Sequence, residues 1–299
     1  MTTLTDAIEL TRSYLMTGQQ DRLNVLDLDI NSVVDTVQFR YELKSIVPNV
    51  RISIDLEEMH VISVTGSGAT STAKVIRGFG GSTAASHTNG AVIRVSPQFS
   101  DWRISQEIND ELEELSAPQS GLYRMKSIEF TYSPAQSGYN INASDMIDIW
   151  RVRYDHPGPE RDWPVMNRNE WYFDQDANTT DFPNGKSLVL RVPAFPGFLV
   201  RVSYKASFGG PLTTGASDVL AVTGLHNEAH DLLSLGAALS LTMGRDIKRS
   251  FMESQPEPRR SDEVGTSAGQ IAMRPLVAKY TDRINAEVTR LQQRYPEQI

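Results

Sequence analysis

The residues that could do chemistry are few, because the chain of 299 residues contains five histidines and no cysteine. His226 and His230 are four residues apart, a spacing that places two imidazoles on one face of a helix and can hold zinc. Zinc proteases need Glu directly after the first His, whereas Glu228 comes two residues later, and spacing suggests no third ligand. We therefore interpret the pair as part of a helix N-terminus.

Two further segments begin like ligand-binding loops and then depart from them. Residues 174–185 start like a calcium loop, but Thr179 stands where that loop needs Gly, and Gly185 stands where it needs Glu. The glycine-rich segment 78–83 lacks the lysine of a phosphate-binding loop, and a strand pattern rather than a helix follows it. A polar loop and a turn are the favoured interpretations.

Paired carboxylates are the remaining candidates for catalysis. Asp55, Glu57 and Glu58 could act as general acid and base, but acids between a strand and a turn are more often solvated, which we expect here. No G-x-S-x-G nucleophile motif occurs, and the absence of cysteine excludes disulfides and thiol nucleophiles. The sequence therefore predicts that the protein is not an enzyme and has no catalytic residues, cofactor or metal.

The elements that carry these residues alternate between helical and extended patterns. Apolar residues at helical spacing predict helices over 4–17, 100–116, 228–252 and 276–295, and alternation with period two predicts strands between them. The predicted fold class is α+β, with a helical bundle core and two inserted antiparallel β units. The predicted domains are a helical core (1–18, 98–120 and 225–299), a β insertion (19–97) and a β-sandwich-like insertion (121–208). Residues 254–270 are predicted to be a mobile linker, and no role is predicted for residues 19–50.

Charge and hydropathy exclude several classes of partner. The formal net charge is −8, which disfavours sequence-independent binding to nucleic acid phosphates. No run of 18 apolar residues occurs, so no membrane span is predicted, and the acidic, amphipathic N-terminus does not have the pattern of a signal peptide. These observations predict a soluble protein made in the cytoplasm.

One segment is more specific than any of these motifs. Residues 75–95 read V-I-R-G-F-G-G-S-T-A-A-S-H-T-N-G-A-V-I-R-V, after a strand pair over 51–64 that carries acidic residues and Met59. This segment resembles a β module of tailed-phage virion proteins. The matching positions are Arg77, Gly78, Gly81, Ser82, Thr83, Ala84, Ala85, His87 and Gly90. We expect the glycines to permit a tight reversal, and Arg77 and His87 to donate turn-stabilising hydrogen bonds.

The order of the later segments extends this resemblance. A helix like 99–116, a β region with Arg153-Tyr154-Asp155-x-Pro157-Gly158 and C-terminal helices follow the module, and together they cover most of residues 50–296. The whole order resembles the head-to-tail adaptor (connector, or neck) proteins of long-tailed bacteriophages. The alternative is another non-enzymatic tail or baseplate component.

The resemblance implies a location and a set of partners. The protein would be a structural virion component at the head-to-tail interface, made in the cytoplasm of the bacterial host. It would form a ring, of twelve copies in this family, under the portal protein. The ring would join the portal to a neck stopper or tail-completion protein and contact double-stranded DNA transiently as it passes; no membrane is involved.

The resemblance also implies site residues. Adaptors of this family dock through their C-terminal segment, so the apolar positions of helix 276–295 are candidates for the portal or neck interface: Leu276, Tyr280, Ile284, Val288, Leu291 and Tyr295. Core packing is the alternative for them. The acids of helix 100–116 are candidates for a channel wall that repels the duplex, with a solvated face as the alternative: Glu107, Asp110, Glu111 and Glu114.

Overall fold

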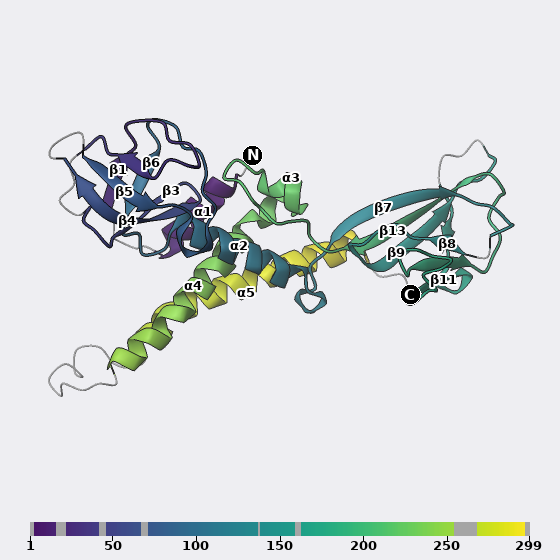
Figure 1. The fold of residues 1–299 in the computed structure, drawn as a ribbon. Helices are drawn as coiled ribbons and strands as arrows, with labels where there is room; N and C mark the ends of the chain where they lie inside the picture. The colour runs from purple at the N-terminus through teal and green to yellow at the C-terminus, as the bar shows by residue number, and fades with distance from the viewer. Residues whose placement is uncertain are drawn as a thin grey trace. The chain divides into compact units, whose positions relative to one another are not determined.

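The computed structural model describes residues 3–15, 22–41, 46–66, 71–136, 138–158, 163–253 and 268–296, with the backbone alone at residues 118, 244–253 and 268–273. The described residues form thirteen strands in three antiparallel sheets, together with five α-helices (Figure 1). They belong to two compact units. Unit 1 consists of Met1–Leu112 and Gly210–Arg283, and unit 2 of Glu113–Gly209 and Ile284–Ile299.

Unit 1 contains a six-stranded antiparallel sheet in the order β1-β6-β3-β4-β5-β2. Its strands are β1 (Arg22–Val25), β2 (Thr36–Gln38), β3 (Arg51–Ile54), β4 (Glu57–Thr65), β5 (Thr72–Ile76) and β6 (Val92–Val95). The two edge strands meet, because Leu26 bridges Phe39 and the Arg40 N–H donates to the Val25 carbonyl at 2.9 Å. The sheet thus closes into a small barrel filled by apolar side chains that include Phe39, Ile52, Met59 and Ile93.

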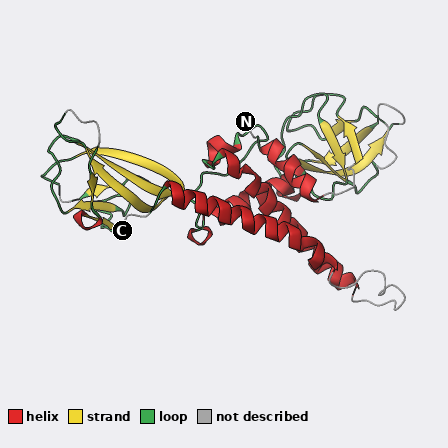
Figure 2. Ribbon diagram, turned by 180° about the vertical axis from the view of Figure 1, so that it is seen from behind, coloured by secondary structure: helices red, strands yellow, loops and turns green. Residues whose placement is uncertain are grey.

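The helices of unit 1 lie outside this barrel (Figure 2). They are α1 (Leu4–Leu15), α3 (Val219–Thr223), α4 (His230–Glu253), most of α2 (Asp101–Ser116) and the first part of α5 (Ala268–Arg294). Helix α1 packs on α4, where the Ser234 hydroxyl donates to the Ala7 carbonyl at 3.0 Å. Arg283 of α5 forms an ion pair with Asp231 of α4 at 2.9 Å. Asp218 caps α3 by accepting two backbone N–H groups.

Unit 2 contains the other two sheets. Strands β7 (Arg124–Thr131), β9 (Met146–Tyr154), β10 (Val165–Met166) and β13 (Leu199–Ala206) form a sheet in the order β10-β9-β13-β7. Strands β8 (Tyr139–Asn140), β11 (Trp171–Asp174) and β12 (Ser187–Leu190) form the other, with β12 in the middle. Buried side chains from both sheets make one cluster, so the sheets share a core.

The predicted helical bundle core with two inserted β units is wrong. The described residues form thirteen strands, and an apolar cluster lies within the sheets of each unit, so the β segments build cores of their own rather than project from a bundle. The physical reason is that an apolar stripe at helical spacing predicts that one face of the helix is buried. It does not predict which element that face packs against. In α5 the apolar positions from Leu276 to Tyr295 are half-buried or exposed, as Val277 is, so they do not form the centre of a bundle core.

The positions of the individual helices, unlike their predicted packing, agree with the apolar periodicity of the sequence. Helices predicted over 4–17, 100–116 and 276–295 occur at 4–15, 101–116 and 268–294. Strands β1 and β2 lie inside residues 19–50, the first part of the predicted β insertion. Most of the predicted linker, residues 254–267, lies outside the described residues. None of the described helices is both long enough and apolar enough to span a bilayer.

Candidate functional site

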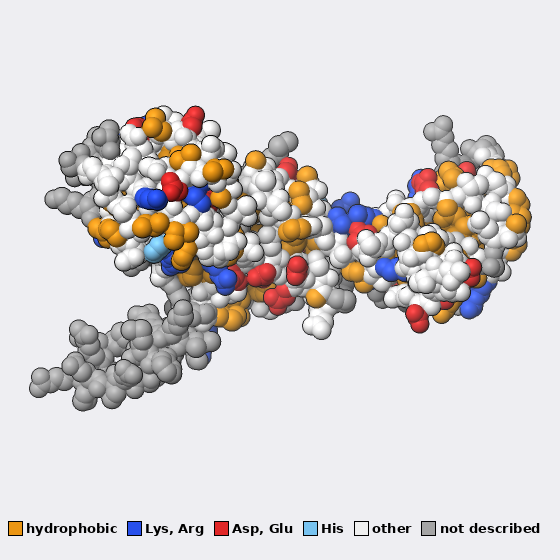
Figure 3. All heavy atoms as spheres, viewed as in Figure 1, with side chains coloured by type: hydrophobic (Ala, Val, Ile, Leu, Met, Phe, Trp, Pro, Cys, Tyr) orange, Lys and Arg blue, Asp and Glu red, His pale blue; other side chains and the backbone are white. Residues whose placement is uncertain are grey.

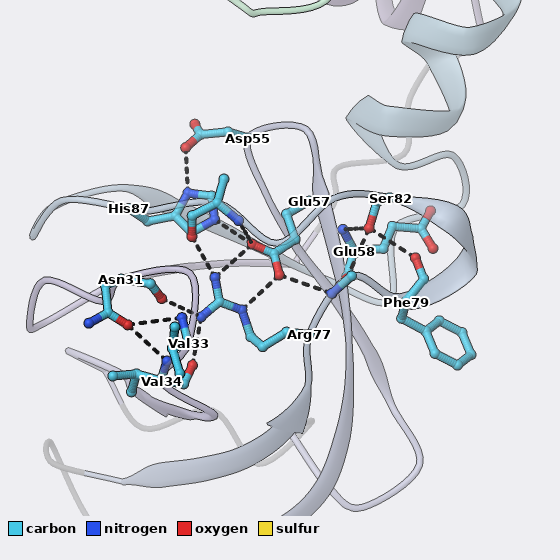
Figure 4. A network of polar contacts seen from close by, with 12 residues as sticks. Asn31, Val33, Val34, Asp55, Glu57, Glu58, Arg77, Phe79, Ser82 and His87 are labelled. Atoms are coloured by element: carbon cyan, nitrogen blue, oxygen red, sulfur yellow. Dashed lines mark hydrogen bonds and ion pairs between the residues drawn. The ribbon is translucent and has the colours of Figure 1, made fainter.

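The side chains of the glycine-rich motif converge on one buried carboxylate, Glu57, at the start of β4 (Figure 4). Arg77 donates to it twice, from Nε at 2.7 Å and from Nη2 at 2.8 Å. The backbone N–H groups of Gly78 and Ala85 donate at 3.1 and 2.9 Å, and Nε2 of His87 lies 2.9 Å from the same carboxylate. Glu57 is only 1% exposed, so all of these interactions are screened from water.

A second carboxylate completes this arrangement, which we call the Glu57 network: Asp55, Glu57, Arg77 and His87. Nδ1 of His87 lies 2.8 Å from Oδ2 of Asp55, whose side chain is largely exposed. Both ring nitrogens of His87 therefore face carboxylate oxygens, and both can donate only when the ring is protonated. The network joins the turn after β3 to the segment after β5.

Local backbone geometry explains how Glu57 comes to be buried. Asp55 and Leu56 form a two-residue turn, with φ of 50° at Asp55, and Ile54 pairs with Glu57 across it. Glu57 then shares the inward side of β4 with Met59 and Val61. The expectation that these acids are solvated is wrong for Glu57 and also for Glu58, which is 6% exposed. Glu57, Met59 and Val61 occupy alternate positions and therefore share one side of the strand. This spacing is the sequence signal that could have predicted the burial of Glu57.

Gly78 and Ser82 of the motif shape the segment that packs against the start of β4. Gly78 has φ of +60°, and a Cβ at this position would lie 3.0 Å from the Ser82 carbonyl oxygen. The Ser82 hydroxyl accepts the Glu58 N–H at 2.9 Å and donates to the Phe79 carbonyl at 2.9 Å. Glycine and serine at these positions thus allow the chain to pass close to β4 and bond to it.

Electrostatics favour the charged form of both central groups of the network. Burial alone would raise the pKa of Glu57, but hydrogen bonds from Arg77, His87, Ala85 and Gly78 outweigh it and lower the pKa from 4.5 to about 2. Burial alone would lower the pKa of His87, but the hydrogen bonds and charges of Asp55 and Glu57 raise it above 6.5. The Glu57 carboxylate thus lies between the guanidinium of Arg77 and the ring of His87, and each interaction favours the charged form of its partner.

The stability of the barrel should depend on pH on both sides of neutrality. Because the pKa of His87 is raised by folding, its contribution is complete below pH 6.5 and is lost as the pH rises through the folded-state pKa. Because the pKa of Glu57 is lowered, its contribution is complete above 4.5 and is lost as the pH falls towards about 2. We expect wild type to lose stability relative to His87→Gln as the pH rises above 6.5 and through the folded-state pKa of His87, measured by urea unfolding. Parallel pH profiles of the two proteins would contradict this expectation.

The network also holds an exposed loop, residues 31–34. Nη1 of Arg77 donates to the carbonyl oxygens of Asn31 and Val34 at 2.8 and 2.6 Å. The Asn31 side chain accepts the N–H groups of Val33 and Val34, both at 2.9 Å. Val33 is nevertheless 84% exposed. The loop thus presents an apolar side chain to solvent on a backbone fixed by a buried arginine.

The other sequence candidates for ligand binding are engaged in local structure. Nδ1 of His226 accepts the Glu228 N–H at 3.4 Å, and Nδ1 of His230 lies 2.7 Å from the Asn227 carbonyl oxygen. In the segment 174–185, Asp174 accepts the N–H of Asp176 at 3.0 Å. Within the part of the chain that the structure describes, no three His, Asp or Glu residues gather in a way that could hold a metal ion.

The acidic side chains predicted to face a channel divide into two groups. Glu107 and Glu111 are buried in unit 1: Glu107 accepts the Ser240 hydroxyl at 2.6 Å, and Glu111 accepts the Tyr280 hydroxyl at 2.5 Å. Asp110 and Glu114 are exposed. Burial removes Glu107 and Glu111 from any surface that DNA could meet in this chain, and the role of the two exposed acids stays a prediction.

The apolar positions of α5 predicted to dock on the portal are all half-buried: Leu276, Tyr280, Ile284, Val288, Leu291 and Tyr295. In unit 2, Val288 packs beside Gly121, and the Tyr295 ring lies edge-on to Trp150 with centroids 5.3 Å apart. In unit 1, Tyr280 bonds Glu111 as described above. These contacts give the positions a role within the chain, and their docking role stays a prediction.

Each unit contains a small cavity lined by described residues. The cavity in unit 1 is about 160 Å³ and is lined in part by Arg51, Ser53, Glu58 and Trp102. The cavity in unit 2 is about 170 Å³. Neither is lined by a member of the Glu57 network, whose polar groups bond to one another instead. The geometry therefore favours a structural role for the motif.

Comparison of the chain with protein-family models and with curated proteins gave no match.

Proposed function

We propose that this chain is a structural virion protein, a head-to-tail adaptor that forms a ring under the portal of a long-tailed bacteriophage and joins it to the neck. The proposal starts from the resemblance of residues 50–296 to that family. The observation that carries it is the exposed apolar loop 31–34, which the Glu57 network holds from beneath. In this proposal the residues of the resembled motif have no catalytic role, and they hold the backbone of a contact surface in place.

Exposed apolar side chains are the physical basis of this purpose. Among the described residues between 22 and 95, nine large hydrophobic side chains have more than a third of their surface exposed: Leu23, Leu28, Val33, Val34, Tyr41, Val47, Ile62, Ile76 and Val92. Figure 3 shows such side chains at the surface of the unit 1 barrel among charged ones. Exposed apolar surface with a polar surround is typical of protein–protein contacts. A ring subunit needs such contacts on neighbouring copies and on the portal.

The test is assembly of the purified full chain on portal rings encoded in the same genome, measured by native mass spectrometry. We expect rings on the portal for wild type. Val33→Glu should weaken assembly at least about a hundredfold, because it places an unpaired charge in an apolar contact. Val192→Glu is the matched control, since Val192 is also exposed but belongs to unit 2. A wild-type chain that stays monomeric with portal rings would refute the adaptor function.

A further inference from the structure

A group of arginines lies on the outer face of the four-stranded sheet of unit 2. Alternate residues of β13 are buried in the core, so the residues between them face outward. One of these, Arg201, lies directly opposite Arg153 of the neighbouring strand β9 (Figure 1). Arg151 lies two residues before Arg153 and opposite Ser203, and it therefore shares the same face. We call Arg151, Arg153 and Arg201 the arginine face.

The arginine face is electrostatically unfavourable within one chain. Like charges directly opposite each other destabilise a sheet. Burial and the neighbouring charge of Arg153 both lower the pKa of Arg151. Arg201 forms an ion pair with Glu129 at 2.6 Å, but the Arg153 side chain has neither a hydrogen bond nor an ion pair to the described residues. Arg153 thus adds a positive charge that pairs with no described carboxylate.

Apolar side chains border the arginine face. Val165 of β10 lies opposite Arg153, and Leu199 lies two residues before Arg201 on β13. Both of these apolar side chains have more than a third of their surface exposed. The guanidinium carbon of Arg201 lies 4.3 Å from the centre of the Trp163 ring. Arginine and tryptophan beside exposed aliphatic side chains are the composition of a protein–protein contact.

A surface of the opposite charge lies on α2. Asp110, Glu113 and Glu114 are all exposed, and their spacing of three and four residues places them on one face of the helix. Asp110 and Glu114, which are four residues apart, repel each other. The side chains of these three acids form no ion pair with the described residues. This surface, which we call the acidic stripe, is therefore also unfavourable within one chain.

We propose that the arginine face of one copy of this chain binds the acidic stripe of a second copy. Each surface repels itself and carries the charge that relieves the other, so a second copy is the occupant that the charges favour. Because the two surfaces differ, the contact is head-to-tail and can repeat from copy to copy around a closed ring. Such a contact rests on the ring function proposed above, since it joins neighbouring subunits of that ring. The net charge of −8 keeps the contact weak between free copies.

The test reverses one charge on each surface and measures self-association of the full chain by sedimentation velocity, without portal rings. At about 50 mM salt, where exposed charges are weakly screened, wild type should self-associate at protein concentrations up to about 1 mM. Arg153→Glu and Glu114→Lys should each weaken this association at least about tenfold, because each change brings like charges together in the contact. Added salt should weaken the association of wild type more than that of either variant.

An equimolar mixture of the two variants tests the pairing of these surfaces directly. The arginine face of the Glu114→Lys chain and the acidic stripe of the Arg153→Glu chain are both unchanged, so mixed dimers should form with the affinity of wild type. A contact between two copies of the same surface would not be restored by mixing. Arg191→Glu and Asp181→Lys are the matched controls, since they make the same charge changes at other exposed positions of unit 2 and should associate as wild type does.

Both variants are expected to fold, since Arg153→Glu places a carboxylate opposite Arg201 and Glu114→Lys places a cation four residues after Asp110. If either does not fold, Arg153→Gln and Glu114→Gln should show a smaller weakening in the same direction.

Three outcomes would overturn the contact: wild type that stays monomeric at about 1 mM, variants that associate as wild type does, or a mixture that associates no better than its components. Because portal rings are absent, these outcomes are separate from the test of the adaptor function. Association of free copies together with no ring on the portal would refute the adaptor function and retain the contact.

Discussion

Glu57→Gln should lower the free energy of unfolding of the barrel by about 3–5 kcal/mol, the range found when one partner of a buried ion pair is removed. Five donors converge on the Glu57 carboxylate, and an amide turns one acceptor oxygen into a donor that faces them. The Arg77 guanidinium, whose side chain is 8% exposed, would keep its charge without its partner. Hydrogen exchange of the β3 and β4 amides measures the loss in unit 1 directly.

Glu129→Gln is the matched control for this substitution. Glu129 also pairs with an arginine, Arg201, at 2.6 Å, but both side chains are 39% exposed. Solvent-exposed pairs contribute about 0–1 kcal/mol, so the control should cost at most about 1 kcal/mol. Equal effects of Glu57→Gln and Glu129→Gln would show that the Glu57 network does not stabilise the barrel.

Gly236→Ala should destabilise unit 1 by about 2–3 kcal/mol, although the same change in an open helix position usually stabilises by about 1 kcal/mol. Gly236 lies in the buried face of α4, and a Cβ there would overlap the carboxyl group of Glu111 on α2. Glu111 cannot simply rotate away, because it is buried and accepts the Tyr280 hydroxyl. Urea unfolding followed by circular dichroism measures the change.

A double-mutant cycle identifies the cause of this effect. Glu111→Ala removes the group that a Cβ at Gly236 would meet, so the double variant should be more stable than the sum of the two single changes predicts, by at least about 1 kcal/mol. Strict additivity, or a stabilising Gly236→Ala, would mean that α4 and α2 do not approach as closely as the structure shows.

Periodicity in the sequence predicts the places of most helices and strands because it reflects local geometry. Strand β9, with its alternation from Met146 to Tyr154, occurs over the predicted residues. Closure of the barrel could not be predicted, because it depends on β1 and β2. These strands have four and three residues, which is too short for alternation to show, and they find partners far away in the sequence.

The burial of charged residues was the other feature that sequence reasoning missed. Position in the sequence predicts a solvated side chain for Glu57, and a channel wall or a solvated helix face for Glu107 and Glu111, whereas each of the three lies buried among partners. Those partners are not close in sequence: Arg77 is 20 residues from Glu57, and Tyr280 is 169 from Glu111.

The contact between α1 and α4 has a consequence for the newly made chain. Ala7 and its partner Ser234 are 227 residues apart, so the apolar face of α1 leaves the ribosome long before the helix that covers it. At about 5–20 residues per second, Leu4, Ala7 and Ile8 stay uncovered for roughly 10–45 s. The barrel strands between residues 22 and 95, by contrast, have all their partners within that span. They can therefore pair before α4 has been synthesised and can cover α1.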